Sequence, residues 1–256
     1  MRILLVNDDG VHSDGLQAMR DELVRHADVD VVVPLTEQSG VGHKITYRTP
    51  LQAHAWSVNG KRYAWLVDGT PADCVKLGVM QLCERKPDLI VSGINPGANV
   101  GLNLFYSGTV AGALEGAMFG IPSVAVSVYL NKGVLPDFPA IAADAWTIIG
   151  QLREARPQQT AWNINFPAVE GRPQGVKLVP MQWQRERELV EPRNDPRGRP
   201  YYWVGLHPIR NHPTTPGFDV GEVDQQHVAV TPLTLDLSDA AALAEMDGGL
   251  TLPDAT

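Results

Sequence analysis

The sequence has few cysteines, no long apolar run and no excess of basic residues, and each shortage excludes a class of protein. Two cysteines, Cys74 and Cys83, are too few for a disulfide scaffold or a zinc cluster. No segment approaches the roughly 18 apolar residues of a membrane span, and the N-terminal residues lack the basic and apolar stretches of a signal peptide. We therefore expect a cytoplasmic protein that makes no membrane contact.

Basic residues are outnumbered, with 21 Lys and Arg against 29 Asp and Glu, for a net charge of −8. This sign is unsuited to sequence-independent binding of nucleic acids or anionic membranes. An anionic small molecule can still bind if a metal ion or backbone amides meet its charge locally. With 256 residues, 44% of them hydrophobic, the chain can bury a large core, and we expect one domain over residues 1–256.

Common motifs of nucleotide and hydrolase sites are also missing. The glycine-rich stretch at residues 97–101 has neither P-loop nor GxGxxG spacing, which argues against dinucleotide binding. No GxSxG elbow is present, so Ser–His–Asp hydrolysis lacks support. The seven histidines show no metal-binding spacing. A functional site must therefore be built from other side chains.

Strand and helix signals alternate through residues 1–165. Residues 2–6 are a continuous apolar run, typical of a parallel strand covered on both faces, and residues 16–24 then repeat apolar side chains at helical spacing. This alternation predicts an α/β fold with a doubly wound, mostly parallel, Rossmann-like sheet. The further predicted elements are strands 29–33, 88–92, 123–128 and 161–166, helices 70–83, 109–119 and 140–155, and a hairpin over 51–67.

The pattern changes after Pro167. Strand signals at residues 201–205 and 227–233 are not separated by a helical pattern, and charged and proline-rich sequence precedes them. We expect residues 180–235 to form a hairpin-rich C-terminal extension, an appendage that contacts other copies of the chain.

Asn7-Asp8-Asp9-Gly10 directly follows the strand predicted at 2–6. Two adjacent carboxylates at the end of a buried strand are costly unless a positive charge compensates them. A hard divalent cation such as Mg²⁺ or Mn²⁺ prefers oxygen ligands and would do so. Asn, Asp and Gly are also turn formers, so the same residues are consistent with a plain strand-ending turn.

Two further loops are expected beside this acidic turn, because ligands in open α/β sheets bind outside the carboxyl ends of the strands. Ser39, after the second predicted strand, and Asn95, after the third, can add neutral oxygen ligands to those of Asp8 and Asp9. His43 is a candidate substrate contact or proton donor, and a polar loop residue is the alternative. A site built from three separate loops is more specific than any one of them.

Ser107, Gly108 and Thr109 open a predicted helix of small residues. A helix N-terminus offers free amides and about half a positive charge, which suits a phosphate group. Simple capping by Ser107 or Thr109 is the alternative. Asn99, in the preceding glycine-rich loop, is a further candidate substrate contact. Glu115, later in the helix, is expected in a surface or capping role.

These motifs occur together in one family. The chain resembles the SurE family of stationary-phase survival proteins, which are 5'/3'-nucleotidases, and the resemblance covers nearly its whole length. The matching segments are residues 2–10 (RILLVNDDG), 37–40 (EQSG), 68–75 (DGTPADCV), 91–101 (VSGINPGANVG), 106–110 (YSGTV), 163–167, 195–204 (DPRGRPYYWV) and 230–235 (VTPLTL).

The resemblance implies a metal-dependent phosphomonoesterase that acts on nucleoside monophosphates, with 3'-nucleotides and short polyphosphate as further candidate substrates. It implies that one divalent ion, Mg²⁺ or Mn²⁺, is held by the positions of Asp8, Asp9, Ser39 and Asn95. The Ser-Gly-Thr turn would line the phosphate pocket. The resemblance also implies a homodimer or homotetramer in which the C-terminal hairpin extension is exchanged.

The hypothesis for the reaction is attack by a metal-activated water, with Asp8 and Asp9 holding the ion and one of them accepting the water's proton. A second hypothesis makes one of the two a nucleophile that forms an aspartyl phosphate, although adjacent aspartates differ from the separated D-x-D pattern expected for that chemistry. A third is a nucleotide sensor that keeps the metal site for binding without catalysis.

Overall fold

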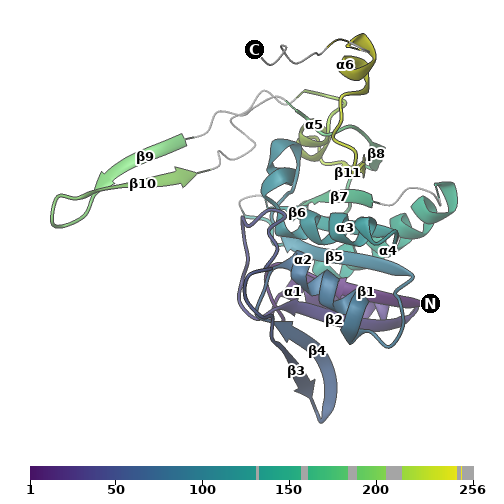
Figure 1. Cartoon of the computed structure of the whole chain (residues 1–256). Helices are drawn as coiled ribbons and strands as arrows, with labels where there is room; N and C mark the ends of the chain where they lie inside the picture. Colours follow the sequence, from purple (N-terminus) through teal and green to yellow (C-terminus); the bar gives the residue numbers. More distant parts are fainter. Residues whose placement is uncertain (131–132, 157–160, 184–188, 206–214, 247–248, 250–256) are drawn as a thin grey trace, which may run out of the picture.

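The structure is a computed structural model that describes residues 1–130, 133–156, 161–183, 189–205, 215–246 and 249. Among these residues, nine strands form one central sheet (Figure 1). They are β1 (Arg2–Val6), β2 (Asp28–Pro34), β3 (Ala53–Val58), β4 (Lys61–Val67), β5 (Leu89–Pro96), β6 (Ser123–Tyr129), β7 (Ala161–Pro167), β8 (Val176–Leu178) and β11 (Val228–Leu233). Their order across the sheet is β3-β4-β2-β1-β5-β6-β7-β11-β8.

The central strands run parallel. β1 pairs with β2 on one side and with β5 on the other, and β6 and β7 continue the parallel series. The β3–β4 hairpin and the β7–β11 pair are antiparallel. The predicted α/β fold with a doubly wound, mostly parallel sheet is therefore confirmed. The chain changes its direction of travel across the sheet between β1 and β5, where such folds bind ligands.

Helices cover both faces of the sheet. They are α1 (Asp14–Leu23) and α4 (Phe138–Ala155) on one face, and α2 (Pro71–Leu77) and α3 (Gly108–Met118) on the other. Side chains of β1 alternate between these layers: Ile3 and Leu5 pack with α1 and α4, whereas Leu4 and Val6 pack with α2. Burial on both faces explains why this strand is continuously apolar.

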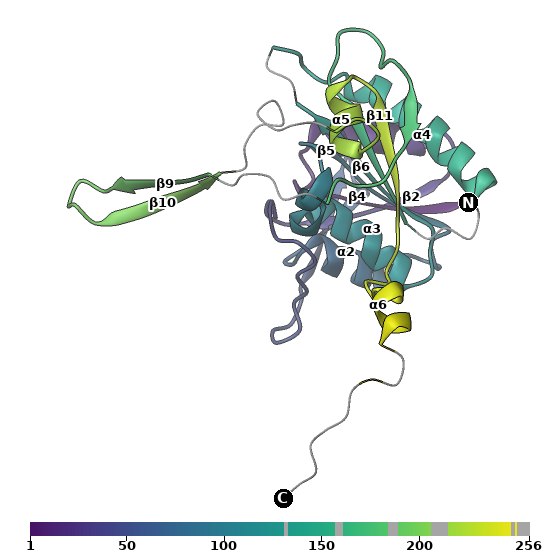
Figure 2. The same cartoon turned by 90° about the horizontal axis from the view of Figure 1, so that it is seen from above.

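The C-terminal part of the chain adds strands to the central sheet and also forms a hairpin outside it. β9 (Leu189–Asn194) and β10 (Pro200–Gly205) form a separate antiparallel hairpin that extends far from the body (Figures 1 and 2). The strand predicted at 227–233 lies in the main sheet as β11, and a helix that the sequence pattern did not predict, α5 (Asp219–Asp224), precedes it. Within the expected appendage over 180–235, residues 184–188 and 206–214 lie outside the described residues.

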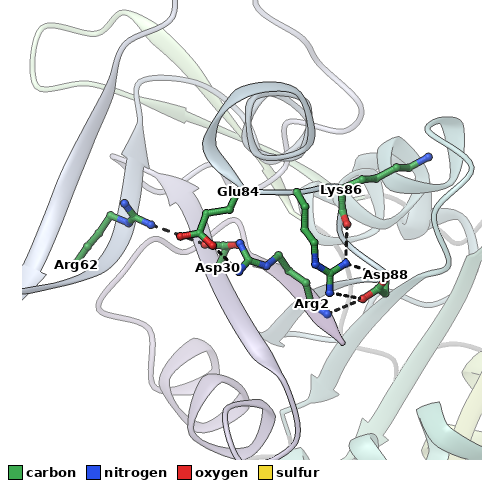
Figure 3. A network of polar contacts seen from close by, with 7 residues as sticks. Arg2, Asp30, Arg62, Glu84, Lys86 and Asp88 are labelled. Atoms are coloured by element: carbon green, nitrogen blue, oxygen red, sulfur yellow. Dashed lines mark hydrogen bonds and ion pairs between the residues drawn. The ribbon is translucent and has the colours of Figure 1, made fainter.

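Charged residues around the start of β1 form a network on the side of the sheet opposite the carboxyl ends of the strands (Figure 3). The Arg2 guanidinium lies 2.9 Å from a carboxylate oxygen of Glu84 and 3.2 Å from one of Asp30. The backbone N–H of Arg2 donates to Asp88 at 2.7 Å, and Arg85 pairs with the same carboxylate at 3.1 Å. These charges join strand starts, far from the carboxyl edge.

Both cysteines are free thiols, Cys74 buried and Cys83 half-buried, as their small number predicted. In the described part of the chain, none of the helices combines the length and apolar character needed to cross a bilayer.

Candidate active site

Loops from three strand ends meet at the carboxyl edge of the sheet. The loop after β2 is joined to the turn after β1 by a 2.8 Å hydrogen bond from the Gln38 N–H to the Asp8 carbonyl oxygen. The same loop is joined to the segment after β5 by a 2.9 Å bond from the Gly42 N–H to the Tyr106 carbonyl oxygen. The three loops expected at one edge are therefore in mutual contact.

The turn after β1 satisfies its own polar groups. The Asn7 amide donates to the Gly10 carbonyl oxygen at 2.9 Å and accepts from the Gly10 N–H at 3.1 Å. Gly10 has a φ of +89°, which glycine adopts without strain. The turn interpretation is thus correct for Asn7 and Gly10, and it leaves the two carboxylates between them for another role.

Asp8 reaches the first turn of α3. The residue is only 4% exposed, and its Oδ1 accepts a 2.7 Å hydrogen bond from the Thr109 hydroxyl. A Cβ atom on Gly108 would lie 3.0 Å from Asp8 Oδ2, so the helix backbone and the carboxylate are nearly in contact. The positive end of the α3 dipole therefore faces this carboxylate.

Glycines on one face bring α3 this close to the sheet. Gly108, Gly112 and Gly116 recur every four residues and therefore share a face of the helix. A Cβ at Gly112 would lie 2.8 Å from Ser92 Oγ, and one at Gly116 would collide with Ser123 Oγ. The small residues seen in the sequence thus set the distance between helix and sheet.

Asp9 has one carboxylate oxygen without a partner. Its Oδ2 is buried and has no hydrogen-bond partner among the described residues. Burial raises the pKa of Asp9 to about 7, with the nearby charges of Asp8 and Glu37 adding to the rise and a hydrogen bond with Ser13 opposing it. Burial also raises the pKa of Asp8, despite its hydrogen bond from Thr109. No cationic side chain of the described residues contributes to the pKa of either aspartate, so the acidic pair is left without a full positive charge there.

A divalent cation fits this arrangement, since it would neutralise the pair and supply a partner for the Asp9 oxygen. In the described segments, no group of three or more His, Cys, Asp or Glu side chains is arranged to hold a metal ion. Ligands beyond the two carboxylates would therefore be neutral oxygens, which is what Mg²⁺ and Mn²⁺ accept.

Ser39, the first predicted neutral ligand, lies in the loop after β2. Asn95, the second, lies near the end of β5 and not in the loop where the sequence placed it, because β5 runs on to Pro96. The Ser39 hydroxyl donates to Glu37 at 2.7 Å, and the Asn95 amide nitrogen donates to the Gly97 carbonyl oxygen at 2.7 Å. In both bonds the side chain donates a hydrogen, so the side-chain oxygens of Ser39 and Asn95 keep lone pairs that these bonds do not use. Glu37, which the sequence interpretation did not single out, adds negative charge beside both aspartates.

Ser107 caps α3, because its Oγ accepts a 3.1 Å hydrogen bond from the Val110 N–H. The capping interpretation is thus correct for Ser107. The hydroxyl of Thr109 points instead to Asp8. The first turn of α3, from Ser107 through Thr109, is therefore built directly onto the acidic pair.

The other two candidate substrate contacts already have protein partners. The side-chain amide of the buried Asn99 donates to Ser127 Oγ at 2.8 Å, and the backbone carbonyl oxygen of Asn99 accepts from the Asn163 amide at 2.7 Å. The His43 Nε2 lies 2.9 Å from Glu115 Oε2. Contacts of Asn99 and His43 with a substrate stay predictions.

Glu115 is buried, so the expectation of a surface or capping role is wrong. The residue is 3% exposed, and the Lys76 Nζ of α2 donates to its Oε1 at 2.6 Å. Lys76 and His43 come from segments far apart in the chain, and no local spacing pattern signals their convergence on Glu115.

Asp219 is a further buried carboxylate, to which the sequence interpretation gave no role. It accepts hydrogen bonds of 2.8 Å from the backbone N–H groups of Gly101, Gln182 and Val220. Burial nevertheless raises its pKa. Asp219 ties the segment between Asn95 and α3 to the C-terminal part of the chain.

Comparisons of the sequence and the structure with known proteins identify one family. The family model described as Survival protein SurE matches residues 3–188. The 5'-nucleotidase SurE of Rhodopirellula baltica is 46% identical over 249 residues, covering 96% of this chain and 97% of that protein. The 5'-nucleotidase SurE 1 of Thermus thermophilus is 45% identical over 251 residues, covering 97% of each. The crystal structure of the SurE protein from Aquifex aeolicus superposes with a TM-score of 0.82 at 38% identity, covering 96% of this chain and 98% of that one.

Proposed function

Because the chain belongs to the SurE family and is a 5'-nucleotidase, a phosphomonoesterase of nucleotides, we propose that it hydrolyses nucleoside monophosphates by water attack at a divalent-cation site. The observation that carries the proposal is the buried acidic pair. Asp9 Oδ2 has no partner among the described residues, and the pKa values of both aspartates are raised by burial.

We assign four residues to one ion, Mg²⁺ or Mn²⁺. Asp8 and Asp9 supply its charged ligands, and Ser39, in the loop after β2, and Asn95, near the end of β5, supply neutral oxygens. When bound, such an ion polarises a phosphoryl oxygen and lowers the pKa of a water molecule. One carboxylate of the pair also accepts the proton that the attacking water loses.

The phosphate group binds at the first turn of α3. The turn from Ser107 to Thr109 lies at the positive end of the helix, and the contacts of Gly108 and Thr109 with Asp8 support phosphate binding beside the proposed cation ligands. This turn orients the ester. We also assign Asn99 and His43 to the substrate pocket.

Further features of the proposal go beyond the 5'-nucleotidase reaction. We include 3'-nucleotides and short polyphosphate among the candidate substrates. The assembly is a homodimer or homotetramer, and the projecting β9–β10 hairpin within residues 180–235 is its contact element. The cytoplasmic location stays a prediction.

Phosphate release from AMP, GMP and 3'-AMP, measured with EDTA and then with added Mg²⁺ or Mn²⁺, tests the proposal. We expect EDTA to abolish release and either cation to restore it. Asp8→Asn should fold normally by circular dichroism and lose more than about 100-fold of kcat, since a cation ligand should matter more than an outer contact. Asp14→Asn, which removes an exposed carboxylate from the first turn of α1, is the matched control and should keep near wild-type turnover.

Two outcomes would point elsewhere. Metal-dependent binding of AMP without phosphate release would favour the non-catalytic sensor. With an ester that is chiral at phosphorus, net inversion supports a single direct attack by water, whereas net retention supports two displacements through an aspartyl phosphate.

A further inference from the structure

Glu115 joins three separate pieces of the molecule at the edge of the site. It lies within α3, and each of its carboxylate oxygens has a partner from a different segment. His43 Nε2, in the loop after β2, lies 2.9 Å from Oε2, and Lys76 Nζ, in α2, lies 2.6 Å from Oε1. None of these three residues belongs to the proposed cation ligands.

The charge state of Glu115 follows from these contacts. Burial acts to raise its pKa, but the hydrogen bonds from His43 and Lys76 outweigh burial, and the pKa lies below its ordinary value of 4.5. Glu115 is therefore ionised at neutral pH, and His43 Nε2 carries the hydrogen that it donates to the carboxylate. Charge-assisted hydrogen bonds of this kind are stronger than neutral ones.

The contact with His43 acts on the loop that carries Ser39. Beside His43, the Gly42 N–H bonds the Tyr106 carbonyl oxygen at 2.9 Å, and on the other side of Ser39 the Gln38 N–H bonds the Asp8 carbonyl oxygen at 2.8 Å. Ser39 itself is exposed, and its hydroxyl bonds only the neighbouring Glu37 among the described residues. Its position relative to Asp8 therefore depends on the anchors on either side.

We propose that Glu115 is a positioning residue, which holds His43 and thereby fixes the loop from Glu37 to His43, with Ser39 in it, against the acidic turn. The proposal rests on the proposed function, because it takes Ser39 as a cation ligand. Glu115 touches neither substrate nor cation in this role. Its effect reaches the reaction through the affinity of the site for the ion.

The chain contains a matched control for this contact. Glu22, in α1, is 9% exposed, and its two oxygens also bind a histidine and a cation: His26 at 2.8 Å and Arg25 at 2.8 Å. Both partners follow Glu22 by three and four residues, and the His26 ring stacks on Trp146 of α4, so this trio joins two helices and not a loop at the carboxyl edge. Glu22→Gln removes a similar network away from the carboxyl edge.

Hydrogen exchange tests the anchoring without reference to activity. In Glu115→Gln, we expect the peptide covering residues 37–46 to exchange at least about tenfold faster than in the wild type, because the loop opens more often. Glu22→Gln should leave this peptide unchanged. His43→Ala, which removes the loop side of the contact and leaves Glu115 paired with Lys76, serves as a second variant if Glu115→Gln does not fold. Unchanged exchange in both site variants would overturn the proposal.

Cation affinity tests the consequence for the site. By calorimetric titration of the substrate-free protein with Mn²⁺, we expect the Kd of Glu115→Gln to rise about tenfold, the effect typical of residues that orient metal ligands. With saturating Mn²⁺, its kcat for AMP should return close to the wild-type value, a rescue that general loss of folding would not produce. Glu22→Gln should bind Mn²⁺ normally.

The outcomes separate this proposal from the proposed function. A wild type that binds Mn²⁺ and releases phosphate, with a Glu115→Gln variant of equal Mn²⁺ affinity, would overturn the positioning role and leave the function intact. A wild type that neither binds Mn²⁺ nor needs it for hydrolysis would overturn the proposed cation site, and with it the role of Glu115 there.

Discussion

The hydroxyl of Thr109 donates a 2.7 Å hydrogen bond to Oδ1 of Asp8, across 101 positions of sequence. This bond joins the end of β1 to the start of α3. The acidic turn and the N-terminus of the helix, which the sequence presents as two separate features, are therefore one structural unit. A phosphate at the helix N-terminus would lie beside the carboxylates proposed to hold the cation.

Thr109→Val tests this unit, because valine keeps the shape of threonine but removes the hydroxyl. The buried Asp8 oxygen would lose its donor, so we expect the free energy of unfolding to fall by about 1–3 kcal/mol. Misorientation of Asp8 should lower kcat/KM for AMP by about 10–100-fold. Urea unfolding and steady-state kinetics with Mn²⁺ measure the two effects. Thr109→Ser retains the hydroxyl and should stay near wild type; equal activity of the Val and Ser variants would refute a role for the bond.

Gly108→Ala tests the close approach of α3. The added Cβ would lie 3.0 Å from both Cβ and Oδ2 of Asp8, and a shift of either group disturbs the site. We expect kcat/KM to fall by at least about tenfold, since small displacements in an active site are costly. Gly150→Ala is the control: it lies within α4 with no atom within 4 Å of the new Cβ, and should raise stability by about 0.5–1 kcal/mol without affecting kinetics. A fully active Gly108→Ala would show that the contact is not needed.

The stability contributed by Glu115 should depend on pH. Because its folded-state pKa is lowered from 4.5, folding favours the ionised form. Its contribution is complete above the pKa of the unfolded chain and is lost as the pH falls through the lower folded-state value. We therefore expect the difference in unfolding free energy between wild type and Glu115→Gln to be constant at neutral pH and to shrink below about pH 4.5. Urea titrations from pH 7 to pH 3 measure it; a gap that widens on acidification would contradict the assignment.

The β9–β10 hairpin should carry contacts between copies of the chain. Tyr202 and Trp203, neighbours on β10, are 63% and 61% exposed on an element that stands away from the body (Figure 2). Exposed aromatic side chains of this size are typical of interfaces. Replacing both by Ser should lower the oligomer mass in multi-angle light scattering. Leu135→Ser, at a residue 92% exposed in a loop of the body, should leave the mass unchanged. The same mass for all three proteins would exclude the hairpin as an interface.

Local signals in the sequence were sufficient to predict most of the fold. The apolar run at residues 2–6 matches β1, whose side chains pack alternately against opposite helix layers. The hairpin predicted over residues 51–67 forms as β3 and β4, joined by the two-residue turn Asn59-Gly60. Such elements depend on hydrophobic periodicity and turn chemistry within a few residues. The helix α5 was missed because a short helix beside a predicted strand carries little periodicity.

The sequence by itself determined which loops lie at the carboxyl edge, since strand order and direction follow from the alternation of strands and helices. It also supplied the acidic pair and the glycines of α3. Only the tertiary structure decided what each side chain contacts. Thr109 donates to Asp8, one Asp9 oxygen has no partner among the residues that the structure describes, and Glu115 is buried between Lys76 and His43. The reason is physical. The burial of a side chain and its hydrogen-bond partners arise from packing between residues distant in sequence. These long-range contacts determine how much free energy it costs to bury a charged group.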